Sequence, residues 1–123
     1  MTLEAALNAW LTEQTGLPAY WLERASEAEN AVVYRALTHG KIAGNLRRSG
    51  IDRDLYSISI YHQSPDTGLE KANSLANVLD DFSGFLAGYS VQLVIFNGGK
   101  DLKVTGESGQ PQYLFVRDFI INH

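Results

Sequence analysis

The stretch from residue 56 to residue 86 changes its hydrophobic period once, and this change limits the folds open to the chain. In the run YSISIY (56–61), large side chains alternate with serines, which is typical of a strand with one apolar and one polar face. Beyond Pro65 the apolar residues recur three and four positions apart, at Ala72, Leu75, Leu79, Phe82 and Leu86. That spacing predicts a helix with one apolar stripe. A strand followed directly by a long helix favours a fold in which helices pack on a sheet.

The start of this helix is predicted from the sequence TGLE (67–70). The Thr67 hydroxyl would accept a hydrogen bond from the Glu70 amide, and the Glu70 carboxylate would accept one from the Thr67 amide, as in a capping box. We therefore predict a helix over about 67–86, with glycines providing its exit.

Further elements are predicted on both sides of this unit. Residues 3–15 have the pattern of an amphipathic helix, with Thr2 as its N-cap and Gly16 ending it. The remaining apolar runs are short and rich in aromatic and β-branched residues, which predicts strands at 19–25, 31–37, 90–96, 102–106 and 113–121. The polar SEAEN predicts a hairpin between the first two, and NGGKD predicts one between 90–96 and 102–106. The last run is apolar on both faces, so we expect it in the middle of a sheet or against a neighbouring chain.

Composition excludes several classes of protein. The chain has 123 residues, which fits one domain over residues 1–123, and its hydrophobic content of 45% suffices for a core without a metal or disulfide. It contains no cysteine, which excludes disulfides and thiolate metal sites. Its net charge of −4 argues against a surface built for nucleic acid. The N-terminus lacks the basic region of a secretory signal, and no apolar run approaches the roughly 20 residues of a membrane span. We expect a soluble cytoplasmic protein.

Residues 38–53 concentrate glycine and positive charge. Lys41, Arg47, Arg48 and Arg53 lie in this stretch, which we predict to be a long flexible loop that could contain a short strand or ribbon. Loops of this length are usually functional or disordered. The cations could bind nucleic acid or an acidic protein surface, and the lack of an aromatic residue to stack on bases favours the protein surface. The alternative is a solvated loop whose charges only aid solubility.

No pattern in the sequence predicts catalysis. His39, His62 and His123 have no spacing typical of metal ligands, and we expect them on the surface or in loops. The G-x-S-x-G turn of a nucleophilic serine is absent, and FNGGKD lacks the sequence and following helix of a phosphate-binding loop. Asp80 and Asp81 are neighbours on the predicted helix and would project about 100° apart, too far for a carboxylate pair. We expect no enzyme activity, catalytic residue, cofactor or bound metal.

The order of these elements resembles that of one known family. The strand AVVYRALTHG leads to the glycine-containing loop and is followed by DLYSISIYHQ. An A-x-x-L-A-x-x-L motif then occupies Ala72, Leu75, Ala76 and Leu79, before Gly88 and the terminal YLFVRDFII. Together with the N-terminal helix, this pattern resembles the small tail terminator (tail completion) proteins of long-tailed bacteriophages and prophages. The resemblance extends over nearly the whole chain and rests on element order and hydrophobicity.

The resemblance implies both a fold and a function. The fold would be α+β, a mixed, mainly antiparallel β-sheet with the N-terminal helix and the helix at about 67–86 packed on it. The protein would form a ring, usually a hexamer, that caps the tail tube, ends its polymerisation and provides a surface for head attachment. Its partners would be its own copies, the major tail tube protein and head–tail connector proteins, with no membrane. The genome would pass through the ring without specific nucleic-acid binding. The protein would occupy the bacterial host cytoplasm before assembly and the virion tail or neck afterwards.

In such a ring we expect Lys41, Arg47, Arg48 and Arg53 at the subunit or tube interface, for instance against the acidic turn that holds Glu27 and Glu29. A head–tail connector or head completion (minor capsid) protein of the neck is one alternative. From other classes, the alternatives are a small ligand-binding or enzyme domain of the helix-plus-curved-sheet type, with its N-terminal helix closing a cavity, and a nucleic-acid-binding module that uses the basic loop.

Overall fold

A computed structural model describes residues 2–24, 30–41, 51–105 and 111–123. Within these ranges the helices are α1 (Leu3–Thr15) and α2 (Pro65–Leu79). The strands are β1 (Ala19–Trp21), β2 (Ala31–Lys41), β3 (Asp52–His62), β4 (Gly84–Leu86), β5 (Tyr89–Val91), β6 (Leu93–Thr105) and β7 (Pro111–Asn122). None of the described helices is long and apolar enough to cross a membrane.

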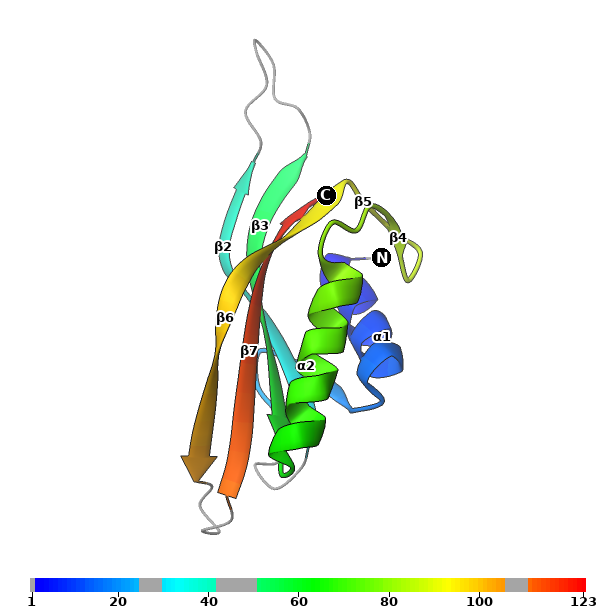
Figure 1. The fold of residues 1–123 in the computed structure, drawn as a ribbon. Helices are drawn as coiled ribbons and strands as arrows, with labels where there is room; N and C mark the ends of the chain where they lie inside the picture. The colour runs from blue at the N-terminus through cyan, green and yellow to red at the C-terminus, as the bar shows by residue number, and fades with distance from the viewer. Residues whose placement is uncertain (1, 25–29, 42–50, 106–110) are drawn as a thin grey trace.

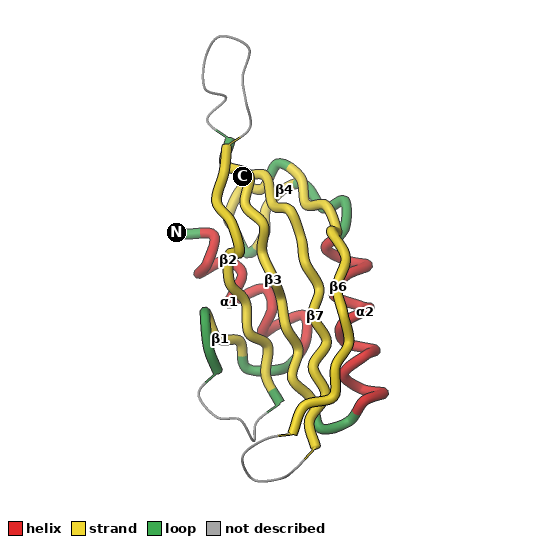
Figure 2. Tube along the Cα trace, turned by 90° about the vertical axis from the view of Figure 1, so that its left-hand side faces the viewer, coloured by secondary structure: helices red, strands yellow, loops and turns green. Residues whose placement is uncertain are grey.

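The fold consists of a curved sheet and one layer of helices (Figure 1). The sheet has the strand order β1-β2-β3-β7-β6, and all its neighbours are antiparallel except β1 and β2. Strands β4 and β5 form a separate two-stranded hairpin. Both helices lie on one face of the large sheet, and Figure 2 shows the strands in front and the helices behind. The fold is α+β with a mixed, mainly antiparallel sheet, as the resemblance implied.

The predicted hairpin between residues 19–25 and 31–37 is wrong. β1 is parallel to β2, with Tyr20 opposite Val33. The chain leaves α1 beside the start of β2, where the Pro18 carbonyl accepts a hydrogen bond from the Val32 amide at 2.9 Å. The two strands therefore begin at the same end of the sheet and run in the same direction. β1 stops after three residues because Leu22 takes a left-handed φ of 78°.

The stretch predicted as a loop at residues 38–53 is largely strand where it is described. β2 extends to Lys41, and β3 begins at Asp52, directly opposite it in the ladder. Pairing of the backbone amides and carbonyls thus continues past the apolar run, with one bulge between Ala36 and Thr38. Residues 42–50, which include Arg47 and Arg48, lie outside the described residues.

The start of α2 corrects the predicted capping box. The N-cap is Ser64, whose hydroxyl oxygen accepts a hydrogen bond from the Thr67 amide at 3.3 Å. Pro65 is the first helical residue, a position where its fixed φ suits the helix and its missing N–H is not needed. The capping box of Thr67 and Glu70 is therefore wrong, because the helix is already under way at Thr67.

The end of α2 also differs from the predicted range of 67–86. The helix ends at Leu79 because Asp80 is extended and Asp81 takes a left-handed φ of 64°. Phe82 and Leu86 continue the apolar spacing but lie beyond the helix, and Leu86 reaches the core from β4. Apolar spacing identified which residues are buried here, but not the backbone that carries them.

The predicted hairpin at Asn97-Gly98 is wrong as well. β6 pairs with β7 on both sides of these residues and continues from Leu93 to Thr105. The NGG sequence forms a bulge, with a register shift between Phe96 and Gly99 and a φ of 99° at Gly98. β7 is long enough to pair with both halves of β6, and it lies inside the sheet between β3 and β6. An interior position is one of the two that its apolar sequence predicted.

The core lies between the helices and the inner face of the sheet. α1 has the predicted bounds, with Thr2 as its N-cap and Gly16 in the left-handed region at its end. The alternation predicted for β3 is confirmed, because every second residue from Tyr56 to Ile60 is fully buried. The helices add Leu3, Leu7, Leu11, Ala72, Leu75 and Leu79 to this core.

Gly68 allows α2 to approach the sheet closely. A Cβ atom added at this position would lie 2.5 Å from Cε2 of Phe115 in β7 and 2.9 Å from Cβ of His62 in β3. Both distances are too short for carbon atoms in contact, and the Phe115 ring is buried and cannot swing away. The first turn of α2 therefore requires a residue without a side chain.

We predict that Gly68→Ala destabilises the protein although alanine is the better helix former. The gain in helix propensity is about 1 kcal/mol, whereas forcing a methyl group into a packed core costs roughly 1–3 kcal/mol. We expect a net loss of up to about 2 kcal/mol in the free energy of unfolding, measured by urea denaturation. Ser74→Ala, at an exposed position of the same helix, is the control and should raise stability by a few tenths of a kcal/mol. A Gly68→Ala variant as stable as this control would contradict the packing described here.

Candidate functional site

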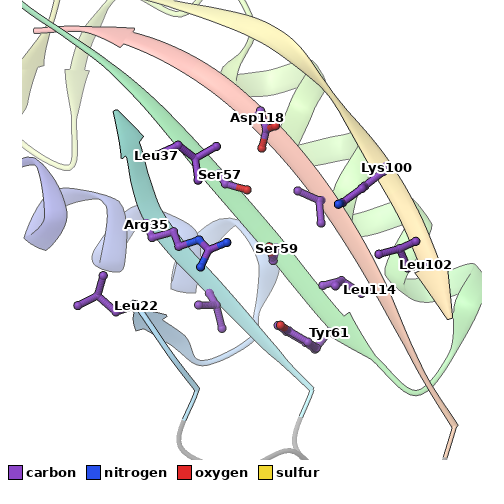
Figure 3. Close-up of a pocket in the computed structure, with 12 residues that line it drawn as sticks. Leu22, Arg35, Leu37, Ser57, Ser59, Tyr61, Lys100, Leu102, Leu114 and Asp118 are labelled. Carbon is purple, nitrogen blue, oxygen red and sulfur yellow. The ribbon is translucent and has the colours of Figure 1, made fainter. Parts of the chain in front are cut away.

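The outer face of the sheet, which no described helix covers, contains a shallow hollow of about 320 Å³ (Figure 3). It spans β2, β3, β7 and β6, and a residue that follows β1 closes one side. The lining residues are Leu22, Val33, Arg35, Leu37, Ser57, Ser59, Tyr61, Lys100, Leu102, Leu114, Val116 and Asp118. We refer to these twelve residues as the outer hollow.

The outer hollow exists because the central strand carries small side chains. Ser57 and Ser59 lie on the outer face of β3, where the alternation places the polar partners of the buried isoleucines. Leu37 of β2 and Leu102 of β6 stand on either side, 44% and 43% exposed. Apolar side chains gathered at such a depression are typical of a surface that binds another molecule.

The outer hollow also carries charges without partners. Arg35 and Lys100 are exposed, and neither forms an ion pair or hydrogen bond with another described residue. Asp118 lies in the same cross-strand row as Arg35 and Ser57, opposite the bulge of β6. One of its carboxylate oxygens is buried without a hydrogen-bond partner among the described residues. An unpaired buried oxygen costs free energy, which a binding partner that donates a hydrogen bond could recover.

Arg24 is a cation on this face that has partners within the chain. Its guanidinium carbon lies 3.9 Å from the centroid of the Tyr61 ring, and Nη1 donates a hydrogen bond to Oε1 of Gln112 at 2.7 Å. These contacts cover the end of the outer face near β1. The charges of Arg35 and Lys100 remain available to another molecule.

The structure places one of the four predicted interface cations on this face. Arg53 is exposed in β3, in a row with Gly40 and Asn122, and the alternation of β3 gives it the same side as Ser57. The backbone of Lys41 pairs with Asp52, but its side chain is not described. Arg47 and Arg48 lie outside the described residues, as do the acidic residues Glu27 and Glu29.

The histidines differ from the surface positions expected of them. His39 is exposed, but His62 and His123 are largely buried. Asp54 joins two of them: its Oδ1 lies 3.0 Å from Nδ1 of His39, and its Oδ2 lies 2.7 Å from Nε2 of His123. The Tyr89 hydroxyl lies 2.7 Å from the other ring nitrogen of His123. This chain of contacts ties β2, β3, β5 and the end of β7 together. No group of three or more His, Asp or Glu among the described residues could hold a metal ion.

The other buried histidine, His62, stabilises the start of α2. His62 is the last residue of β3, and its Nδ1 accepts a hydrogen bond from the Ser64 amide at 3.0 Å. Burial, together with the nearby charge of Lys71, lowers the pKa of His62 below its usual value. The neutral ring can accept the amide hydrogen bond that holds the N-cap residue in place.

Two buried tyrosines are fully engaged beneath α1. The Tyr34 hydroxyl donates to the Glu4 carbonyl and the Tyr56 hydroxyl to the Glu4 carboxylate, each at 2.8 Å. Burial, the hydrogen bond to Glu4 and nearby negative charges raise the pKa of Tyr56 far above its usual value. Burial likewise raises the pKa of Tyr34. These hydroxyls fasten the helix to the sheet, and the space between the two is filled by the core residues.

Comparison with solved structures shows that this fold has been seen before. The chain is similar to a chain in the virion of a native gene transfer agent (GTA) particle, with a TM-score of 0.65 over 98% of this chain and 95% of that chain. The two sequences are 14% identical, so the likeness establishes a shared fold. A second solved structure, 12% identical, covers 96% of this chain and 89% of its own with a TM-score of 0.51. No protein-family model and no curated protein matches the sequence.

The outer hollow was missed from the sequence. The signal for it was the alternation of β3, which assigns the serines to the outer face. Identifying Arg35, Lys100 and Asp118 as residues of one hollow required the strand order and register as well, because they come from three different strands.

The buried tyrosines predict a loss of stability at alkaline pH. In the unfolded chain a tyrosine ionises near pH 10, whereas Tyr34 and Tyr56 hold their protons to higher pH in the fold. The unfolded state therefore binds fewer protons above pH 10, and the free energy of unfolding falls by up to about 1.4 kcal/mol per pH unit for each tyrosine. Below pH 10 the tyrosines keep their protons in both states, and their contribution to the free energy of unfolding is fully present.

This prediction is tested by urea unfolding between pH 8 and pH 11 on the wild type and on Tyr56→Phe. The variant should be less stable at pH 8 by roughly 1.5–3 kcal/mol, because it lacks a hydrogen bond to a carboxylate. Its stability should fall less steeply above pH 10, because one of the three tyrosines with a raised pKa (Tyr34, Tyr56 and Tyr89) is gone. Parallel pH profiles for the two proteins would show that Tyr56 ionises in the fold as it does in the unfolded chain.

Proposed function

We propose that this chain is a structural, non-enzymatic protein of a virion, which forms a ring of six copies on the end of the tail tube. The ring ends tube polymerisation and provides the surface to which the head attaches. The main support is the likeness over 98% of the chain to a chain in the virion of a gene transfer agent particle. The element order that resembles tail terminator proteins supports the same conclusion, and it supplies the position in the tail.

The outer face of the sheet has the properties that a ring subunit needs. A closed ring requires two different surfaces on each subunit, so that each copy binds the next through the same contact. One such surface is the outer hollow, with exposed leucines and the unpaired charges of Arg35 and Lys100. Arg53 extends its positive charge along β3. We propose that Lys41, Arg47, Arg48 and Arg53 contact a neighbouring subunit or the tube.

Two other classes of function receive less support. A ligand-binding or enzyme domain closed by α1 would need a cavity between α1 and the sheet, whereas buried residues of α1 and of the sheet form one core cluster and Glu4 engages Tyr34 and Tyr56. A nucleic-acid-binding module would need a continuous basic surface, whereas the outer hollow mixes two cations with an acid and apolar side chains. A head–tail connector or head completion protein of the neck is the alternative within the same class.

The proposal is tested by electron microscopy of the purified protein mixed with tail tubes of its own phage or prophage. We expect monomers or weak association in dilute solution, and a ring of density on one end of the tubes, which then stop growing. Binding to the portal end of isolated heads, with bare tube ends, would support a neck protein instead. A tight dimer by light scattering at all concentrations would contradict a ring.

The proposed role of the basic residues predicts the behaviour of a charge-reversal variant. Arg47→Glu with Arg48→Glu should leave the circular dichroism spectrum unchanged, since surface substitutions usually cost within about 0.5 kcal/mol. Tube capping should be lost, because like charges facing an acidic partner repel. The phenotype would be overlong or headless tails.

The controls separate this effect from DNA binding and from net charge. Lys103→Glu also makes the protein more acidic, but Lys103 lies on β6 opposite Tyr113, on the inner side of the sheet. This control should cap tubes normally. Loss of DNA affinity with normal tail length would indicate a nucleic-acid module, and tails of normal length that join heads in the double variant would refute the site assignment.

A further inference from the structure

The β4–β5 hairpin carries the most exposed large apolar side chain in the described parts of the chain. Phe85 is 75% exposed, whereas its neighbour Leu86 is fully buried and Val91 of β5 nearly so. The hairpin is thus anchored by one face and presents the aromatic ring on the other. Its turn has positive φ values at Ala87 (47°) and Gly88 (87°), as in the tight turns that match the twist of two strands. Phe85 therefore protrudes from a hairpin whose other face is buried in the core.

The charge around this hairpin is negative. Asp80 and Asp81 are exposed in the segment that leads from α2 to β4, and residues 80–92 contain no lysine or arginine. The outer hollow has the complementary character, since Arg35 and Lys100 exceed its one acid, Asp118. It also has an apolar rim, formed by Leu37, Leu102 and Leu114.

The two surfaces lie on opposite sides of the molecule. Figure 1 shows the β4–β5 hairpin on the helix side and the outer face of the sheet turned away from it. They cannot meet within one subunit, but they can meet between two copies. When the hairpin of one copy binds the outer hollow of another, the pair still has one free hairpin and one free hollow. Further copies can then add in the same way until the ring closes.

We infer that the β4–β5 hairpin of one copy inserts Phe85 into the outer hollow of the next copy. The aromatic ring of Phe85 would lie among Leu37, Leu102 and Leu114 of the next copy. Asp80 and Asp81 would face Arg35 and Lys100 of that copy. The contact presupposes the proposed ring and names the surfaces that build it. A face-to-face dimer of two outer hollows is disfavoured, because it would bring the unpaired cations of both copies together.

The absence of cysteine from the chain allows a direct test. Phe85→Cys and Leu102→Cys are made in separate proteins, mixed at the highest soluble concentration and oxidised. A mixed disulfide should form, because bridged residues must approach to within about 7 Å between Cα atoms. The matched control pairs Phe85→Cys with Lys103→Cys, one residue further along β6 and on the other side of the strand. This pair should remain unlinked.

Two further readouts sharpen the result. Phe85→Ser in the otherwise wild-type protein should weaken self-association on the order of tenfold to a hundredfold, as expected for loss of one buried aromatic side chain. Lys100→Glu should lower the yield of the mixed disulfide, whereas Lys103→Glu should not. Phe85 is largely exposed, so Phe85→Ser should retain wild-type stability, which urea unfolding checks.

Each outcome decides either the contact or the proposed function. No mixed disulfide, or efficient homodimers of Leu102→Cys alone, overturns the contact. Rings on tail tubes without the mixed disulfide leave the proposed function intact and refute only this contact. The mixed disulfide without any capping of tubes supports the contact and refutes the tail position.

Discussion

The alternation of side chains along β3 is the constraint on which the rest of the structure depends. Its inner residues, Tyr56, Ile58 and Ile60, are fully buried and form the surface on which both helices pack. Its outer serines are too small to fill the other face, and this leaves the outer hollow. A shift of β3 by one residue would exchange the two faces and expose the core. The packed side of the molecule and the side with the outer hollow are therefore set by the same eleven-residue strand.

The sequence predicted which residues are buried better than it predicted the path of the backbone. α1, the buried face of β3 and the apolar stripe of α2 were all predicted, because burial leaves a strong periodic signal. Three of the errors in the predicted path have local causes that periodicity does not report. α2 begins earlier than predicted because Ser64 caps it and Pro65 is its first residue. It ends earlier because Asp81 takes a left-handed φ. The NGG sequence forms a bulge because β7 is long enough to pair with β6 on both sides of it. The direction of β1 could not be predicted from the local sequence, because it depends on where the chain leaves α1 relative to β2.

Little of the candidate site could be predicted from the sequence. Of the four cations that it named, Arg53 lies on the outer face of the sheet, and their role at an interface stays a prediction. The sequence drew attention to residues 38–53 because their charges are close together in the chain. The cations of the outer hollow, Arg35 and Lys100, are separated by 65 positions in the sequence and are brought to the same face only by the order β2-β3-β7-β6. The exposure of Phe85 could not be predicted either, because a lone phenylalanine in a sequence is usually a core residue.

The bulge in β6 has a consequence for how large an assembly of this protein can grow. β6 is the edge of the sheet and spans thirteen residues, long enough for another chain to add itself as a sixth strand. Stacking of that kind has no natural end and leads towards fibres. Asn97 and Gly98 break the row of backbone donors and acceptors in its first half, and Lys100 and Lys103 place charge just beyond. The bulge and the two lysines therefore hinder this protein from polymerising through its own sheet edge.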